Sequence, residues 1–169
     1  DTYDIRDKYK NKHMDGTYEL YYYNGNIARK ETYLNGNLDG AFMIFYENGK
    51  INEKLFYKNG KLDGEQITYY YSGQVKKNEA YHDGLLEGTQ TEFFENGDLS
   101  AKSFYRNGKF HGEQICYYEN GQLYKKKNYI NGLLDGEQLE FNSNGKISKK
   151  EFYTMNKPDG ETVSYYDDN

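Results

Sequence analysis

Histidine and cysteine are the side chains best suited to act as nucleophiles, bases or metal ligands, and this sequence has few of them. They are His13, His82, His111 and Cys116. In a repeat of 24 residues that begins at Asp15, the three histidines fall at three different positions, so stacking the repeats does not gather them. A lone cysteine excludes an intramolecular disulfide and a multi-cysteine metal site, and no nucleophile–base pair or metal-ligand spacing stands out. We therefore predict that the protein is not an enzyme and holds no metal or cofactor.

Carboxylates recur in an Asp-Gly-Glu sequence that could suit calcium at stacked turns. The copies are Asp63–Glu65, Asp135–Glu137 and Asp159–Glu161. Neighbouring strands lie about 4.8 Å apart, so successive hairpins lie about 10 Å apart. A calcium ion needs oxygen ligands at about 2.3–2.6 Å, so two copies cannot share one ion. We interpret these carboxylates as turn residues that also keep the sheet edge soluble.

Two columns of side chains, one aromatic and one basic, could bind a partner. The ring at position 8 of the repeat is Tyr22, Tyr46, Tyr70, Phe94 and Tyr118, and the lysine at position 16 is Lys30, Lys54, Lys102, Lys126 and Lys150. Rigid rings are frequent at binding hot spots and can stack on sugars or cage quaternary ammonium groups. We expect the two columns to share one face and predict these ten residues as the partner-binding residues. The alternatives are structural stacking for the rings and, for the lysines, a solvated strand that blocks edge aggregation.

Position 15 is also basic in several repeats, for example at Arg29, Lys77 and Lys125. Alternation along a strand would point this position inward, away from the lysines of position 16. We expect a β-bulge or a snorkelling side chain to turn it outward, so that Lys77 can act together with Tyr70.

All of these columns depend on a repeat that runs through the whole chain without an insertion. Full repeats begin at 15, 39, 63, 87, 111 and 135, and all 18 glycines fall at positions 2, 11 and 22. Glycine confined in this way marks backbone sites that need a positive φ or a close approach. We therefore predict a single array over residues 1–169, with a partial repeat at 1–14, six full repeats at 15–158, and a partial repeat or cap at 159–169.

The turns and the apolar positions predict how each repeat folds. Positions 10–11 and 21–22 are mostly Asn-Gly, the strongest short hairpin signal, and the runs between them are rich in Tyr, Phe, Ile and Thr. Position 7 is always aromatic and position 13 always Ile, Val or Leu. A three-residue loop such as 47–49, a type I turn with Gly49 at a bulge, would set position 7 opposite position 13. The predicted fold class is all-β, an elongated twisted antiparallel meander of tandem 24-residue β-hairpin repeats, with about 14 strands at two per repeat. Its core would be the rings of positions 7 and 19.

Composition limits the class of protein and of partner. The apolar fraction is only 36%, but 21 Tyr and 9 Phe favour a folded chain over a disordered one. The net charge of −5 weighs against nucleic acid or an anionic membrane as the general partner, and no apolar run is long enough to span a bilayer. The abundance of residues with AT-rich codons suggests a bacterial source. The sequence begins at Asp1 without Met, so we expect that an upstream segment was removed, and the protein could be cytoplasmic or exported.

The segment Phe45–Glu65, FYENGKINEKLFYKNGKLDGE, closely resembles the variant MORN repeats of many bacterial proteins. The spacing, both Asn-Gly turns and the Leu-Asp-Gly-Glu junction coincide, and the resemblance covers essentially the whole chain. It implies a β-hairpin array. Bacterial members are often labelled antitoxin components, and other MORN repeats act as protein-interaction or lipid-associating modules. We predict a non-catalytic module that binds a protein partner through its sheet, as an antitoxin-like or cell-envelope-associated protein. The alternative is a module that binds a glycan or a lipid headgroup through the aromatic and basic columns.

Overall fold

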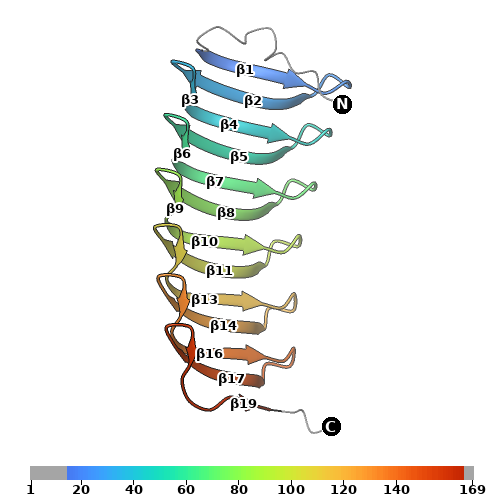
Figure 1. Cartoon of the computed structure of the whole chain (residues 1–169). Helices are drawn as coiled ribbons and strands as arrows, with labels where there is room; N and C mark the ends of the chain where they lie inside the picture. The colour runs from blue at the N-terminus through green and yellow to red at the C-terminus, as the bar shows by residue number, and fades with distance from the viewer. Residues whose placement is uncertain (1–14, 166–169) are drawn as a thin grey trace. The chain divides into compact units, whose positions relative to one another are not determined.

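The computed structural model describes residues 15–165 as β-strands and turns, and no helix occurs in that range (Figure 1). No segment of it could therefore cross a membrane as a helix. The chain divides into two compact units, Asp1–Leu85 and Leu86–Asn169. The partial repeat predicted at 1–14 and the last four residues of the final partial repeat lie outside the described residues.

Unit 1 is an antiparallel meander in which each strand pairs with the next along the chain. Its strands are β1 (Gly16–Tyr21), β2 (Ile27–Leu34), β3 (Asn37–Leu38), β4 (Gly40–Phe45), β5 (Ile51–Lys58), β6 (Lys61–Leu62), β7 (Gly64–Tyr69) and β8 (Val75–His82). The short β9 (Leu85–Leu86) lies where the two units meet in sequence.

Unit 2 repeats the same order of strands. Its strands are β10 (Gly88–Phe93), β11 (Leu99–Arg106), β12 (Lys109–Phe110), β13 (Gly112–Tyr117), β14 (Leu123–Ile130), β15 (Leu133–Leu134), β16 (Gly136–Phe141), β17 (Ile147–Thr154), β18 (Lys157–Pro158) and β19 (Val163–Ser164). The predicted all-β antiparallel hairpin array is confirmed in both units.

The first turn of each repeat has the predicted register. The six full repeats are numbered 1 to 6 in chain order, so that repeat 2 begins at residue 39 and repeat 4 at residue 87. In repeat 2, Phe45 lies opposite Ile51, and the register skips one residue at a bulge between Ile44 and Phe45. The Tyr46 amide donates to the Lys50 carbonyl at 2.8 Å, and the Gly49 amide donates to the Tyr46 carbonyl at 2.9 Å. Gly49 has a φ of 82°, as the bulge position of a type I turn requires. Position 7 faces position 13 in all six repeats.

The second turn is a two-residue type I′ turn, because both of its central residues have positive φ. In repeat 2 these are Asn59, with a φ of 48°, and Gly60, with a φ of 78°. In repeat 6, Asn156 replaces glycine and adopts a φ of 67°, as predicted. In Figure 1 the type I turns lie at the right-hand ends of the hairpins and the type I′ turns at the left-hand ends.

The segment that follows each type I′ turn is broken where a single strand was expected. The Asp63 amide donates to the Phe56 carbonyl at 2.9 Å, and Gly64 takes a φ of 117°, which is outside the strand region. The break separates β6 from β7, and its equivalents recur in every repeat. Residues 15–165 therefore hold nineteen strands where two per repeat predicted about 14.

Alternation along the strands gives each unit two faces, and repeat 4 illustrates both. The tyrosine face carries positions 4, 6, 15, 17 and 19, which in this repeat are Gln90, Glu92, Ala101, Ser103 and Tyr105. The lysine face carries positions 3, 5, 16 and 18, which are Thr89, Thr91, Lys102 and Phe104. Residues at the same positions of the other repeats belong to the same faces.

The most buried side chains lie mainly on the tyrosine face, and many of them are polar. Buried apolar residues among those described are Leu20, Ala28 and Leu55, whereas the buried polar ones are Glu31, Glu79, Gln90, Ser103 and Gln138. The position 19 tyrosines are half-buried and stack with position 24, as in the row formed by Tyr105, Phe110 and Tyr129. The aromatic columns predicted as the core are thus only partly covered, because a single sheet has no second layer to bury them.

Candidate functional site

The basic residues of position 15 point onto the tyrosine face, where acidic side chains hold them. Arg29 Nε lies 2.7 Å from Glu31 Oε1, and the Glu31 side chain is 2% exposed. The Tyr33 hydroxyl donates to the same carboxylate at 2.9 Å. Lys77 pairs with Glu79 at 3.0 Å. The expectation that a bulge or snorkelling would turn position 15 outward is wrong, because the neighbouring carboxylates compensate the inward charge.

Unit 2 has the same kind of pairing on its tyrosine face. Lys125 Nζ lies 2.8 Å from Glu140 of the next hairpin. This hydrogen bond lowers the pKa of Glu140 and raises the pKa of Lys125, so each partner stabilises the charged form of the other. Lys149 pairs with Glu151 at 3.0 Å. Sequence reasoning overlooked the acids of position 17. This position lies two residues before the invariant tyrosine of position 19, so the two must share one face of the strand.

The side chains that could do chemistry are not assembled into a reactive site. Burial raises the pKa of the Cys116 thiol, which disfavours the reactive thiolate. His82 Nδ1 lies 3.3 Å from Asp63, and His111 Nδ1 accepts from the Asn131 amide at 3.5 Å. Residues 15–165 contain no cluster of His, Cys, Asp and Glu able to hold a metal ion. His13 lies outside the described residues.

The acidic residue at position 1 caps the type I′ turn of its own repeat. Asp39 accepts the amide of Asn59 at 3.0 Å, and Asp63 accepts the amide of Asp83 at 3.1 Å. Glu87 and Asp135 make the same contact. The hydrogen bond from the Asp83 amide lowers the pKa of Asp63. The first carboxylate of the Asp-Gly-Glu sequence is therefore engaged by the backbone.

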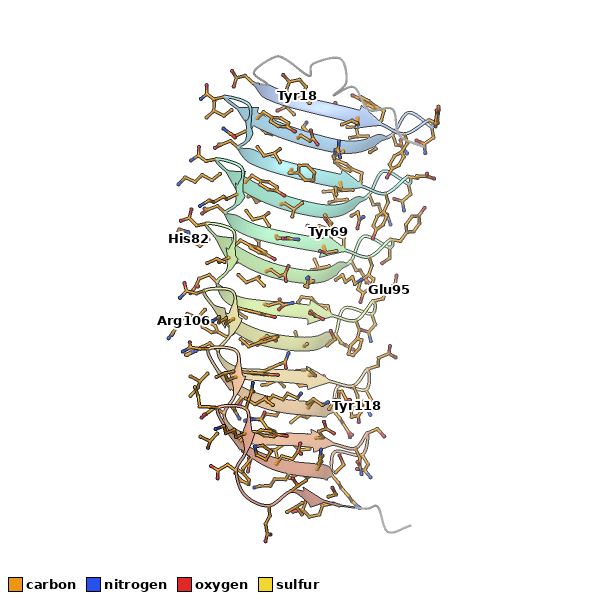
Figure 2. The ribbon with its side chains drawn as sticks, viewed as in Figure 1. Tyr18, Tyr69, His82, Glu95, Arg106 and Tyr118 are labelled. Atoms are coloured by element: carbon orange, nitrogen blue, oxygen red, sulfur yellow. The ribbon has the colours of Figure 1, made fainter. Side chains whose placement is uncertain are left out.

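The aromatic rings of position 8 lie at the type I turns, where they join successive hairpins. The hydroxyls of Tyr22, Tyr46 and Tyr118 donate to position 7 carbonyls of the next repeat at 2.6, 2.7 and 2.8 Å. Lys76 Nζ lies 5.6 Å from the centre of the Tyr70 ring, and Phe94 is half-buried. Figure 2 shows Tyr118 at the turn end of unit 2 that also carries Glu95, opposite the end that carries Arg106. The hydroxyls of these three tyrosines are thus used inside the array.

The lysines of position 16 lie in the middle of the strands, opposite position 5. Position 8 is three residues further along, about 10 Å away at 3.3 Å per residue, so rings and lysines form two separate rows. Three of the five lysines have an acidic partner on their own face. Lys30 pairs with Glu19 at 2.9 Å, and the other two pairs are Lys126 with Glu113 and Lys150 with Glu137.

Lys54 and Lys102 form no ion pair with any described residue. Lys54 Nζ lies 5.2 Å from the centre of the Phe56 ring. Lys102 lies opposite Thr91 in its own hairpin and opposite Ile115 in the next. Repeat 4 carries threonine at positions 3 and 5, where other repeats place the acids that pair with lysine. Lys102 is consequently an exposed cation without a counter-ion among residues 15–165.

A hollow of about 390 Å³ lies beside Lys102 on the lysine face of unit 2. We call it the repeat 4 pocket; its lining includes Thr89, Lys102, Phe104, His111, Glu113 and Ile115. The Phe104 residue is 37% exposed. A Cβ built on Gly112, which also lines the pocket, would meet nothing within 4 Å. Sequence reasoning missed Phe104, yet Phe recurs at position 18 in every second repeat, as Phe56, Phe104 and Phe152.

Comparison with known proteins identifies the repeat. A family model described as MORN repeat variant matches residues 14–35, 38–59, 62–83, 86–107, 110–131 and 134–154. Comparison with curated proteins finds no match. Among solved structures, a crystal structure of a GtfA/B complex bound to UDP and GlcNAc is similar, with 11% identity and a TM-score of 0.27; the match covers 63% of this chain and 21% of that chain. A likeness this low has no bearing on function.

Proposed function

Because the chain belongs to the MORN repeat variant family, a family of non-catalytic repeat modules associated with binding, we propose that it docks a protein partner through the lysine face. The observation that carries this proposal is the repeat 4 pocket, which combines the unpaired Lys102 with the exposed ring of Phe104 and the side chain of Ile115. Apolar surface flanked by charge is the composition of protein interfaces.

The tyrosine face supports the proposal less well than the lysine face does. Its charges are largely paired with each other, as in Arg29 with Glu31 and Lys125 with Glu140, and a partner would have to replace those pairs. The rings of position 8 remain predicted partner contacts at the turn ends. The three tyrosines whose hydroxyls donate to carbonyls could offer a partner only their rings. A glycan or lipid headgroup is the competing ligand, and it would need such rings freely exposed.

A photo-crosslinking experiment in the source cell tests where the partner binds. The photoreactive residue p-benzoylphenylalanine replaces Phe104 on the lysine face, Glu95 in a type I turn, or Lys109 beside a type I′ turn. We expect one protein to be captured in stoichiometric yield through position 104. Capture only through position 95 or 109 would place the site on the turns and overturn the proposal. No protein at any position, with retention on cell-wall sugars or liposomes, would favour the competing ligand.

The identity of the captured protein would show in which cellular process this protein acts. We extend the proposal to a bacterial protein that is antitoxin-like or associated with the cell envelope, as the resemblance to variant MORN repeats implies. An antitoxin-like role requires the captured protein to be a toxin whose activity falls when the complex forms. An envelope role requires the captured protein to be part of the cell surface. Capture of neither class would leave the docking proposal standing and remove this extension.

A further inference from the structure

We infer that the repeat 4 pocket recognises an acidic side chain next to an apolar one in a segment of the partner protein. This inference rests on the proposed function and names the chemistry of the partner. Lys30, Lys126 and Lys150 are each neutralised by a glutamate on the same face, whereas Lys102 faces Thr91 and Ile115. The pocket therefore presents an ammonium group that no carboxylate among the described residues pairs.

The polar groups around Lys102 are also suited to an anion. His111 uses Nδ1 to accept from the Asn131 amide, so in its neutral form it carries its proton on Nε2 and can donate. Thr89 adds a hydroxyl to the lining. The one carboxylate of the lining, Glu113, is occupied by Lys126 at 2.5 Å. The ammonium group of Lys102, Nε2 of neutral His111 and the Thr89 hydroxyl can all donate, and a carboxylate accepts such hydrogen bonds more strongly than a neutral amide does.

The apolar part of the pocket sets the second requirement. Phe104 and Ile115 line it, Phe104 is exposed, and no atom lies within 4 Å of a Cβ built on Gly112. A hollow of about 390 Å³ is at the small end of ligand pockets, which suits one or two side chains rather than a folded domain. A Leu or Phe side chain beside an acidic residue would cover the ring while its neighbour pairs with Lys102.

The inference can be tested with two synthetic peptides and isotope-labelled protein. One short peptide alternates Glu with Leu and Phe; its control carries Gln in place of every Glu. We expect the Glu peptide to shift the Ile115 methyl and Thr89 amide resonances and to bind at least about tenfold more tightly than the Gln peptide, about 1.4 kcal/mol. Equal binding of the two peptides, or no shift with either, would overturn the inference.

Variants separate this inference from the proposed function. Lys102→Met should abolish the preference for Glu over Gln while the peptides still bind weakly, and Lys54→Met, the matched control in unit 1, should preserve the preference. Phe104→Ser should weaken both peptides. If the native partner still crosslinks at position 104 but the preference survives Lys102→Met, the docking proposal stands and the acidic recognition is wrong. An unchanged β spectrum by circular dichroism confirms that each variant is folded.

Discussion

Repeats 2 and 4 carry the same lysine and phenylalanine pair at positions 16 and 18, yet the two pairs have different surroundings. In repeat 2 the Lys54 ammonium lies over the Phe56 ring, and a Cβ built on Gly64 would lie 3.2 Å from Phe56 Cβ. In repeat 4 the Phe104 ring is exposed, and the equivalent Gly112 has open space beside it. The backbone hydrogen bonds and registers of the two hairpins are the same.

The difference arises from the side chains around the pair. Lys54 lies opposite Met43, whereas Lys102 lies opposite the shorter Thr91. A shorter neighbour leaves space, and a threonine supplies no carboxylate to neutralise the lysine. A repeat array can therefore make a local site by changing single residues on a constant backbone, because each hairpin contacts only its neighbours.

The largest expected effect is on the backbone that the two repeats share. Gly97 has a φ of 93° in the type I turn of repeat 4, where a β-branched residue is strained. Gly97→Val should reduce the free energy of unfolding more than Lys102→Ala does, by about 1 kcal/mol or more. Urea titrations of the two variants measure this difference. Equal midpoints would contradict the assigned turn.

A second prediction compares the two rings directly. Phe56 is half-buried, with its Cβ 3.2 Å from a Cβ built on Gly64, whereas Phe104 is 37% exposed. Phe56→Ala should therefore cost more stability than Phe104→Ala, with a difference of about 1 kcal/mol, since the cost of truncation grows with burial. Urea titration again gives both values. If Phe104→Ala costs as much as Phe56→Ala, the repeat 4 pocket is closed in solution.

The parts of the fold that local chemistry determines could be predicted from the sequence. The Gly49 and Gly60 turns and the pairing of Phe45 with Ile51 follow from Asn-Gly chemistry and from the apolar positions. The break at Asp63–Gly64 was not predicted as a strand end. Glycine at position 2 signals an unusual φ but not where the strand ends. The hydrogen bond from the Asp83 amide to Asp63 joins residues twenty apart, so local sequence does not reveal it.

The candidate site could be predicted only in part, because it depends on which lysines are neutralised. The sequence shows a lysine at position 16 in five of the six repeats but not which acid reaches it. Lys126, for example, pairs with Glu113, thirteen residues away. The rings of position 8 were expected beside the lysines, and the bulge with its turn carries them to the hairpin ends. Phe104 was overlooked because its period is two repeats rather than one.

A third prediction uses the glycines that flank the two rings. Gly64→Ala would bring the new methyl group to 3.2 Å from Phe56 Cβ, an atom close to the backbone that cannot easily move. Gly112→Ala meets no atom within 4 Å, so only the strain of its positive φ remains. Gly64→Ala should be the more destabilising by about 0.5–1 kcal/mol, measured by thermal or urea unfolding. A reversed order would show that the ring of Phe56 is as free as that of Phe104.

The smallest expected effect concerns pH at a junction that all the repeats share. The amide of Asp83, more than the nearby His82 and Lys58, lowers the pKa of Asp63. A carboxyl whose pKa is lower in the folded than in the unfolded chain stabilises the fold above the unfolded value, about 3.9. This contribution disappears as the pH falls through the lowered folded pKa.

Asp63→Asn is the variant that isolates this contribution, because the amide oxygen of Asn can still accept from Asp83 but carries no charge. The parent should be the more stable of the two at neutral pH, and the difference should shrink between about pH 5 and pH 2. Urea titrations at several pH values follow it. His82 lies 3.3 Å from the same carboxylate. The parent and the Asp63→Asn variant are therefore also compared in a His82→Ala background. A pH-dependent difference that persists there belongs to the backbone amide. A pH-dependent difference that vanishes there would come from the His82 imidazole. The charge of Asp63 would then stabilise repeat 3 through a side chain that the other repeats lack at that position.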